Sequence, residues 1–314
     1  MTVPPGATEP SRPISGGAET FHSGYVAVLG VPNAGKSTLV NALTGRKVAG
    51  VSSKAQTTRR RILGIRDEPG YQFVFVDTPG FGEGQQKLGE LMTRTATVAA
   101  READVILYVI DATRPESGNA MKRLLKGNTH PAILVVNKSD AVPKPALLPL
   151  MERYGTFSEF REIVPLSALR EDGTAMLLGL VRALLPVGPR WYDAASALRA
   201  EPESALVQEV IQERMFERLH QEIPYGCAAQ VESMEREGNL LRIEAVILVE
   251  RNSHKPIMIG AGGSMIKQVG TEARLELERT LGCKVYLSLR VKVEEDWRDR
   301  EAVLSDLGYT AKPD

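Results

Sequence analysis

Short apolar runs alternate with longer mixed segments through the first half of the chain. The runs cover residues 25–29, 73–76, 105–110 and 132–136, and each is followed by Gly, Asp or Asn. Continuous apolar strands that alternate with helix-length segments are typical of a parallel sheet covered on both faces. Residues 61–66 and 71–76 are joined by Glu68-Pro69-Gly70, and they instead predict a hairpin at one edge. The first half is therefore predicted to be one α/β domain.

The second half has a different pattern, which begins after Pro186 and Pro189 interrupt the chain. Residues 204–221 have an apolar stripe at helical spacing, and residues 227–234 and 240–249 are predicted strands. A glycine-rich loop follows, then a helix to about residue 281 and an alternating strand at 284–293. With a short helical turn before the loop, the order is helix, strand, strand, helix, helix, strand.

Composition changes this picture little. Lys plus Arg and Asp plus Glu are 39 each, so the formal net charge is zero and any nucleic-acid site must be local. Cys227 and Cys283 are too few for a disulfide framework and predict buried thiols in a reducing cytoplasm. Apolar stretches stay shorter than the about 18 residues of a membrane helix. Residues 1–21 are rich in Pro, Gly and Ser and predict a disordered tail.

A phosphate-binding loop follows the first apolar run. It matches G-x-x-x-x-G-K-[ST] and opens a predicted helix at 38–43, which is the context that this motif requires. Its backbone amides surround phosphates, Lys36 reaches the β- and γ-phosphates, and the Ser37 hydroxyl is a Mg²⁺ ligand. The predicted phosphate-binding residues are Gly30, Val31, Pro32, Asn33, Ala34, Gly35, Lys36 and Ser37.

A second motif, N-K-x-D, follows the run at 132–136 and indicates a guanine base. The Asp140 carboxylate can accept two hydrogen bonds from guanine, one from N1–H and one from the 2-amino group. Adenine lacks both donors, so discrimination against adenine nucleotides can reach ~10⁴. The backbone amides after the next strand are a weaker third contact, to guanine O6. The predicted base-binding residues are Asn137, Lys138, Ser139, Asp140, Ser167, Ala168 and Leu169.

A third motif, D-T-P-G, completes the nucleotide site. Asp77 can hold Mg²⁺ through water, and the Gly80 amide can sense the γ-phosphate. Upstream, Thr58 is predicted to complete the Mg²⁺ shell only when the γ-phosphate is present. Lys36, Thr58 and Gly80 are the predicted catalytic residues. The contacts from this turn are expected from Asp77, Thr78, Pro79, Gly80 and Phe81.

The glycine-rich loop in the second half matches G-x-x-G between two helices, as in KH domains, where this loop clamps the nucleic-acid backbone. Ser264 is expected to cap the following helix. The domain holds more Asp and Glu than Lys and Arg, so few phosphate contacts and a shallow salt dependence are expected. Lys284, Arg290 and Lys292 are weaker candidates. The predicted RNA-binding residues are Gly260, Ala261, Gly262, Gly263, His254, Lys255 and Lys267.

Taken together, these residues resemble the TrmE–Era–EngA group of translation-factor-related GTPases, and over residues 22–309 the Era family of ribosome-assembly GTPases. The resemblance is carried by 30–37, 54–59, 77–80, 137–140 and 167–168, and in the second half by 245–250 and 258–267. This chain departs from the family pattern between the two glycines of the loop, where it has Ala261 and Gly262 and the family usually has a lysine.

The resemblance implies an α/β P-loop GTPase domain followed by an α+β type II KH domain. The expected boundaries are tail 1–21, G domain 22–186, linker 187–203, KH domain 204–309 and tail 310–314. It also implies Mg²⁺-dependent GTP hydrolysis to GDP, binding near the 3′ end of the small-subunit rRNA and a role in 30S subunit maturation. We expect a cytoplasmic monomer, with peripheral membrane association reported for such relatives.

Two residues bear on the rate of hydrolysis. Phe81 stands where Ras-like enzymes have a water-orienting Gln, so intrinsic turnover should be slow. Asn33 occupies the position that relatives use to bind K⁺, with the carbonyls of Ser52 and Lys54 and with Thr57 as further candidate ligands. A K⁺ there would supply the positive charge of an arginine finger.

Two other functions remain open from the sequence. One is an RNA chaperone that uses GTP binding as a timer with little hydrolysis, a reading that Phe81 keeps open. The other is a phosphotransferase built on the same phosphate loop, against which residues 137–140 argue. Two GTPase domains in tandem are excluded by the single motif set.

Overall fold

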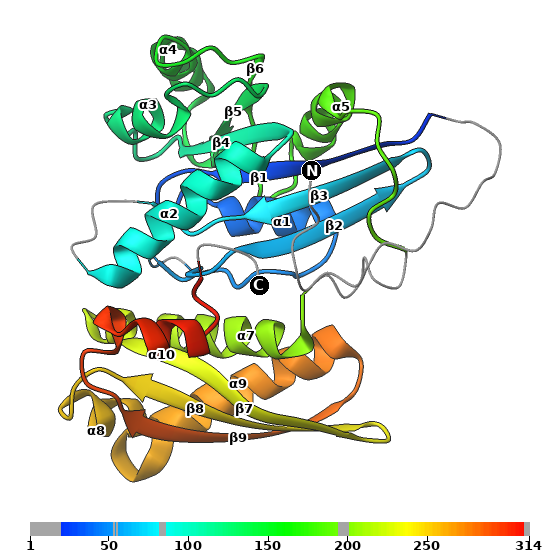
Figure 1. Ribbon diagram of the computed structural model, residues 1–314. Coiled ribbons are helices and arrows are strands. Elements are labelled where there is room, and N and C mark those ends of the chain that lie inside the picture. The colour runs from blue at the N-terminus through cyan, green and yellow to red at the C-terminus, as the bar shows by residue number, and fades with distance from the viewer. Residues whose placement is uncertain (1–19, 53, 55, 82–85, 194–200, 311–314) are drawn as a thin grey trace.

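The computed structural model describes residues 20–52, 54, 56–81, 86–193 and 201–310. Most of the two predicted tails and part of the predicted linker lie outside these residues. The described chain forms two domains, stacked one above the other in Figure 1. Within the described ranges, the structure has no helix that is both long enough and apolar enough to cross a membrane.

The first domain is built on a six-stranded sheet in the order β2-β3-β1-β4-β5-β6. Only β2 is antiparallel to its neighbour, which confirms the predicted hairpin at the edge. The strands are β1 (His22–Leu29), β2 (Ile62–Glu68), β3 (Tyr71–Asp77), β4 (Val105–Asp111), β5 (Ala132–Asn137) and β6 (Glu162–Pro165).

Helices cover both faces of this sheet, as the continuous apolar strands require. On one face, α1 (Lys36–Thr44) and α5 (Thr174–Leu184) pack on alternate strand residues such as Val26 and Val28. On the other face, α2 (Lys87–Glu102), α3 (Asn119–Leu125) and α4 (Lys144–Gly155) pack on the intervening residues such as Ala27 and Leu29. The phosphate and guanine motifs therefore lie at the carboxyl ends of neighbouring parallel strands.

The predicted domain boundary at residue 186 is too early. The Gln72 side chain accepts hydrogen bonds from the amides of Trp191 and Tyr192 at 2.9 and 3.0 Å, and it donates one to the Tyr192 carbonyl at 2.7 Å. Val187 also pairs with His22 of β1. Residues 187–192 thus pack on the first domain rather than forming a linker. Residues 194–200 of the predicted linker lie outside the described residues.

The second domain has the predicted order of elements around a three-stranded sheet, β7-β8-β9. β7 and β8 are antiparallel and β8 and β9 are parallel, the arrangement expected for a type II KH domain. Its elements are α7 (Glu203–Arg218), η2 (Ile223–Gly226), β7 (Cys227–Glu237), β8 (Leu240–Val249), α8 (His254–Ile259), η3 (Ala261–Gly263), α9 (Ser264–Leu281) and β9 (Lys284–Val293). Both cysteines are buried, as predicted.

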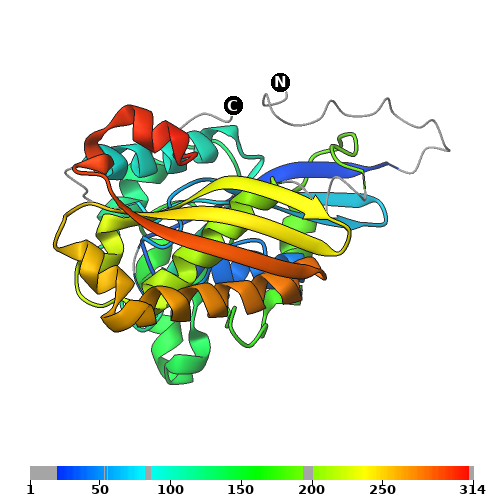
Figure 2. The same ribbon diagram turned by 90° about the horizontal axis from the view of Figure 1, so that it is seen from below.

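One face of this sheet packs on α7 and α9, which Figure 2 shows from below. The other face packs on a C-terminal segment that the sequence pattern did not predict, η4 (Trp297–Asp299) and α10 (Glu301–Asp306). This segment also lies beside α2 of the first domain, where Leu88 and Met92 join the same apolar cluster. The two domains therefore share a buried core.

Candidate functional site

Two glycines set the shape of the phosphate loop between β1 and α1. Gly35 adopts a left-handed φ of 93° before α1, and a Cβ there would lie 2.2 Å from Nδ2 of Asn137. Gly80, after β3, approaches the loop so closely that a Cβ would lie 2.6 Å from the Pro32 amide nitrogen. The loop is thus held between the guanine motif and the D-T-P-G turn by contacts that a side chain would prevent.

A chain of three oxygen-bearing side chains lies at the start of α1. The Ser37 hydroxyl donates to Oδ2 of Asp77 at 2.6 Å and lies 2.9 Å from Oγ1 of Thr58. The Oδ1 atom of Asp77 is buried and has no hydrogen-bond partner within the described part of the chain. Burial raises the pKa of Asp77 to about 6, against the opposing effects of Ser37 and Lys36. This group of oxygens around an unpaired buried carboxylate atom suits a hard divalent cation.

Lys36 lies beside this group as predicted. Its ammonium is buried and donates to the Val31 carbonyl at 3.0 Å, across the loop. Burial lowers its pKa to about 8, and the charges of Asp77 and Glu116 oppose the shift. Phosphate oxygens would give this buried charge anionic hydrogen-bond acceptors in addition to the Val31 carbonyl.

The N-K-x-D residues join the phosphate loop to the base-binding loops. Asn137 donates to the Ala34 carbonyl at 2.9 Å and accepts from the Ala168 amide at 3.0 Å. The Lys138 ammonium donates to the Asn33 carbonyl at 2.8 Å and to Oδ2 of Asp111 at 2.6 Å. These contacts fix the three motifs relative to one another. The Ala168 amide, one of the predicted partners of guanine O6, is committed to Asn137 in this structure.

Asp111 lines the cavity beside these motifs, and sequence reasoning missed it. It ends β4, the strand between the phosphate loop and the guanine motif, and it orients Lys138. Burial by itself would raise the pKa of Asp111, but the hydrogen bonds from Lys138 and Thr113 and the charge of Lys138 together lower it. Its position after a buried strand, shared with Asp77 and Asn137, was the available signal.

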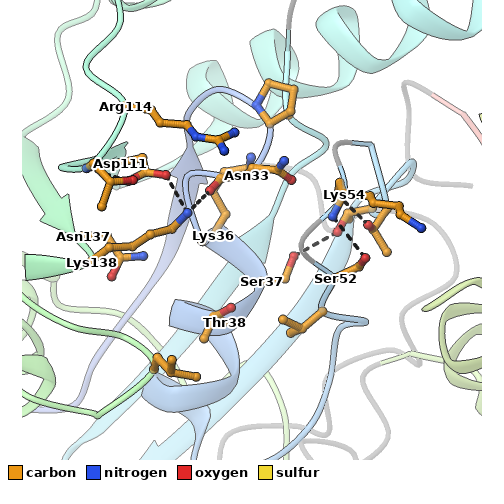
Figure 3. A pocket seen from close by; sticks show the side chains of 18 of the residues that line it. Asn33, Lys36, Ser37, Thr38, Ser52, Lys54, Asp111, Arg114, Asn137 and Lys138 are labelled. Atoms are coloured by element: carbon orange, nitrogen blue, oxygen red, sulfur yellow. Dashed lines mark hydrogen bonds and ion pairs between the residues drawn. The ribbon is translucent and has the colours of Figure 1, made fainter. Parts of the chain in front are cut away.

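The motifs surround one cavity of about 440 Å³ (Figure 3). Arg114, which lines this cavity, was also missed by sequence reasoning. The lining includes residues from all the nucleotide motifs: Pro32, Asn33, Gly35, Lys36, Ser37, Thr58, Gly80, Asn137, Lys138, Asp140, Ser167 and Leu169. A cavity of this volume is in the range of small-molecule sites.

Two predicted nucleotide contacts have other roles in the structure. The Phe81 side chain is buried in the core, where its ring meets Tyr108 edge to face at 6.2 Å between centroids. The Thr78 hydroxyl donates to the Val28 carbonyl at 2.8 Å. The side chain of Phe81 therefore does not line the cavity. The predicted nucleotide contact of Phe81 stays a prediction, which its backbone would have to provide.

The candidate K⁺ ligands approach the same cavity from two sides. Asn33 belongs to the phosphate loop, and Ser52 and Lys54 lie on the opposite side of the pocket in Figure 3. The Lys54 carbonyl already accepts a hydrogen bond from Oγ1 of Thr57 at 3.1 Å. Ser53 lies outside the described residues.

The glycine loop of the second domain has the backbone that its sequence predicts. Gly260, Gly262 and Gly263 have φ angles of 77°, 57° and 80°, and Ala261 and Gly262 are exposed. Ser264 is the first residue of α9 and Gly263 precedes it as the cap, so the predicted Ser264 cap is wrong. A left-handed glycine ends the turn without a side-chain hydrogen bond.

The basic residues around this loop divide into two groups. Lys255 and Lys267 are exposed on the helices that flank the loop, as an RNA contact requires. His254 is buried against Gly226, so the predicted surface contact with RNA is not supported for its side chain. Arg290 and Lys292 form ion pairs with Glu232 and Glu294.

Comparisons with known proteins agree with this arrangement. The family described as 50S ribosome-binding GTPase matches residues 25–138, and the KH domain family matches residues 222–298. GTPase Era of Geobacter sp. (strain M21) is 44% identical over 92% of this chain and 98% of its own. GTPase Era of Lacticaseibacillus paracasei is 43% identical over 93% and 98%.

Two solved structures share the whole fold. Era in complex with MgGDPNP and nucleotides 1506–1542 of 16S ribosomal RNA has a TM-score of 0.87 and 38% identity, over 92% of this chain and 99% of that chain. A variant of Aquifex aeolicus Era bound to GDP·AlF4⁻ has a TM-score of 0.86 and 37% identity, over 92% and 100%. Sequence, fold and site geometry lead to one conclusion: the chain belongs to the GTPase Era family.

Proposed function

We propose that this protein hydrolyses GTP to GDP with Mg²⁺, binds the 3′ end of small-subunit rRNA and assists maturation of the 30S subunit. The observation that carries the proposal is the contact of the Ser37 hydroxyl with both Thr58 and Asp77, whose Oδ1 is buried and has no hydrogen-bond partner among the described residues. Ser37 and Thr58 line the same cavity as Asp140. A metal site and a guanine-selective carboxylate in one cavity are what a GTPase requires.

Each residue has a role in this proposal. Ser37 and Thr58 would hold Mg²⁺ directly and Asp77 through water, and the ion would neutralise charge on the β- and γ-phosphates. Lys36 binds those phosphates, and the Gly80 amide lies next to the loop that surrounds them. The carboxylate of Asp140 selects guanine.

Slow intrinsic turnover is part of the proposal. The Phe81 side chain is buried against Tyr108 and cannot orient water. Asn33 and the carbonyls of the opposing loop are candidate K⁺ ligands, which would place positive charge near the phosphates. Turnover measured at equal Na⁺ and K⁺ concentrations checks this, and equal rates would contradict a K⁺ site.

RNA binding is assigned to the Gly260–Gly263 loop with Lys255 and Lys267. The exposed glycine backbone allows phosphates to approach, and the two lysines flank it. The relative whose structure holds nucleotides 1506–1542 of 16S rRNA matches 92% of this chain at 38% identity, which supports the same RNA class here. Monomeric state and peripheral membrane contact stay predictions.

Crosslinking of the full chain to total RNA in GTP and in GDP, followed by mapping, tests the assignment. Contacts concentrated at the 3′ end of the small-subunit rRNA are expected, and contacts elsewhere would contradict it. Single-turnover hydrolysis with and without small subunits separates a GTPase from an RNA chaperone that uses GTP only as a timer.

A further inference from the structure

Two adjacent residues of the metal-binding loop face different domains. Thr58 reaches Ser37 in the first domain, 2.9 Å between hydroxyl oxygens. The next residue, Arg59, is only 2% exposed and extends into the second domain. Residues 57–59 belong to neither helix nor strand, so ladder hydrogen bonds do not hold Thr58 in place. Contacts of the neighbouring side chains must do so.

The Arg59 guanidinium ends in a set of backbone carbonyls. Its Nη1 donates to the Cys227 carbonyl at 2.7 Å, and its Nη2 donates to the carbonyls of Pro224 and Tyr225 at 3.2 and 3.1 Å. These acceptors belong to η2 and the first residue of β7, so their spacing is fixed by the fold of the second domain. We call these three carbonyls and the rings of Phe216 and Trp297 the arginine socket.

The two rings of the socket enclose the guanidinium. Its central carbon lies 5.3 Å from the Phe216 ring centroid and 5.5 Å from that of Trp297, within the range of cation–π contacts. Planar stacking together with several fixed donors is a geometry that arginine satisfies and lysine does not. A buried cation with so many partners has one strongly favoured position.

Other cations of the same loop region also contact the second domain. The Lys54 ammonium donates to the Phe216 and Leu219 carbonyls at the end of α7. Lys47 pairs with Glu213 of α7 at 2.7 Å, and Arg60 pairs with Glu209 at 3.3 Å. Arg59 differs from these residues because it adjoins the metal-binding Thr58.

We propose that Arg59 is a positioning residue: its seat in the arginine socket places Thr58 at Ser37, so recognition of the γ-phosphate depends on the docked KH domain. The proposal rests on the proposed GTPase activity and adds a part of the site that the second domain supplies. The competing reading is that Arg59 only joins the two domains. In that case its loss would lower stability without changing the preference for triphosphate over diphosphate.

The experiment compares Arg59→Ala and Arg59→Lys with Arg61→Ala in the full chain. Arg61 is the matched control because it pairs with Glu102 at 3.3 Å and lies over Tyr25, both in the first domain. Affinities for GDPNP and GDP are measured with Mg²⁺, together with kcat, KM and the melting temperature. The GDPNP-to-GDP ratio is read without turnover, so a wild-type chain that fails to hydrolyse GTP would contradict the proposed function and not this inference.

Arg59→Ala should lower the affinity for GDPNP and kcat by about tenfold, a loss of about 1.4 kcal/mol, and leave GDP affinity within about twofold. Arg59→Lys, which keeps the charge, should also lose most of the preference for GDPNP over GDP. Arg61→Ala should retain that preference. The inference is overturned if both Arg59 substitutions keep the wild-type GDPNP-to-GDP ratio while the melting temperature falls. It is also overturned if Arg61→Ala lowers the GDPNP-to-GDP affinity ratio as much as Arg59→Ala does.

Discussion

At the scale of single residues, the carboxylate of Asp140 forms an ion pair with Arg170 in this structure, 3.3 Å from Oδ2 to Nε. Its neighbours Asn137 and Lys138 are committed to the phosphate loop. Asn137 and Lys138 therefore brace the loops, and Asp140 is the residue of this motif that we propose accepts the two hydrogen bonds from guanine.

Asp140→Asn should move nucleotide preference from GTP to xanthosine triphosphate. The amide can donate where the carboxylate only accepts, so GTP affinity should fall by ~10³ or more while the xanthine nucleotide gains. Equilibrium binding of both nucleotides checks this. Arg170→Ala removes the ion-pair partner but keeps the carboxylate, and it should remain selective for GTP; a phosphotransferase indifferent to the base would show neither change.

Glu209 of α7 is a buried acid at the domain interface. It pairs with Arg60, and its Oε2 has no hydrogen-bond partner among the described residues. Burial raises its pKa to about 7 from 4.5, and nearby Asp77 and Glu201 add to the rise. Because the folded-state pKa exceeds the unfolded value, this group's stabilising contribution is complete below about pH 4.5 and is lost as the pH rises towards 7.

Glu209→Gln should therefore flatten the pH dependence of stability. Its unfolding free energy relative to wild type should increase between pH 5 and 8 by up to about 3 kcal/mol, the equivalent of its pKa rise. Chemical denaturation at several pH values measures the difference. Glu217→Gln, at an exposed position of α7, is the control and should show no such trend.

At the scale of elements, the direction of α9 decides which basic residues lie near the glycine loop. This helix carries the chain away from the loop, by about 27 Å at 1.5 Å per residue. Lys284 starts β9 at its far end. Lys284 is therefore remote from Gly260–Gly263, which the spacing in the sequence did not reveal. Of the predicted basic residues, Lys255 and Lys267 are the two that stay candidates for phosphate contacts at the loop.

Ala261→Lys should strengthen RNA binding because it adds a cation to the exposed tip of the loop. The slope of the logarithm of the association constant against the logarithm of the salt concentration should steepen by about 0.7 for one added phosphate contact on single-stranded RNA. Titration of a 16S 3′-end fragment at several salt concentrations measures this. Leu275→Lys adds the same charge at an exposed position farther along α9, where no change in slope is expected; an equal effect would argue against the loop as the binding site.

At the scale of the whole molecule, the two domains share an apolar cluster between α2, the KH sheet and the C-terminal segment. Leu88 and Met92 of the first domain pack with Trp297, which is fully buried and donates to the Gly226 carbonyl at 3.0 Å. Asp299 also accepts the Lys87 amide at 3.0 Å. The same Trp297 forms one wall of the arginine socket, so domain packing and loop position use common atoms.

Met92→Ala should lower the free energy of unfolding by about 2–4 kcal/mol, as for other buried truncations. In a Trp191→Phe background, which leaves Trp297 as the one tryptophan, fluorescence during chemical denaturation should report the loss from the other domain, because the cluster spans both. Met176→Ala, on α5 and 54% exposed, should stay within about 0.5 kcal/mol of wild type. If the midpoint followed by Trp297 stayed unchanged in Met92→Ala, the two domains would not be coupled through this cluster.

The nucleotide site and the order of elements were largely predictable from the sequence. Phosphate and guanine binding depend on short motifs that each adjoin an apolar strand, and parallel strands bring their carboxyl ends to one edge. The same reasoning missed Asp111, which carries no motif of its own. It also did not reveal that the side chains of His254 and Phe81 are buried, because burial depends on which face of an element meets the core.

The sequence by itself predicted a GTP site at residues 30–37, 77–80 and 137–140, and it determined that a KH-type fold follows. Only the tertiary structure decided how the two halves meet, with Arg59 seated in the carbonyls of Pro224, Tyr225 and Cys227. The physical reason is that the motifs are local in the chain, whereas the socket is built from backbone atoms and rings far away in sequence. Backbone carbonyls carry no residue signature, so folding alone can reveal where they converge.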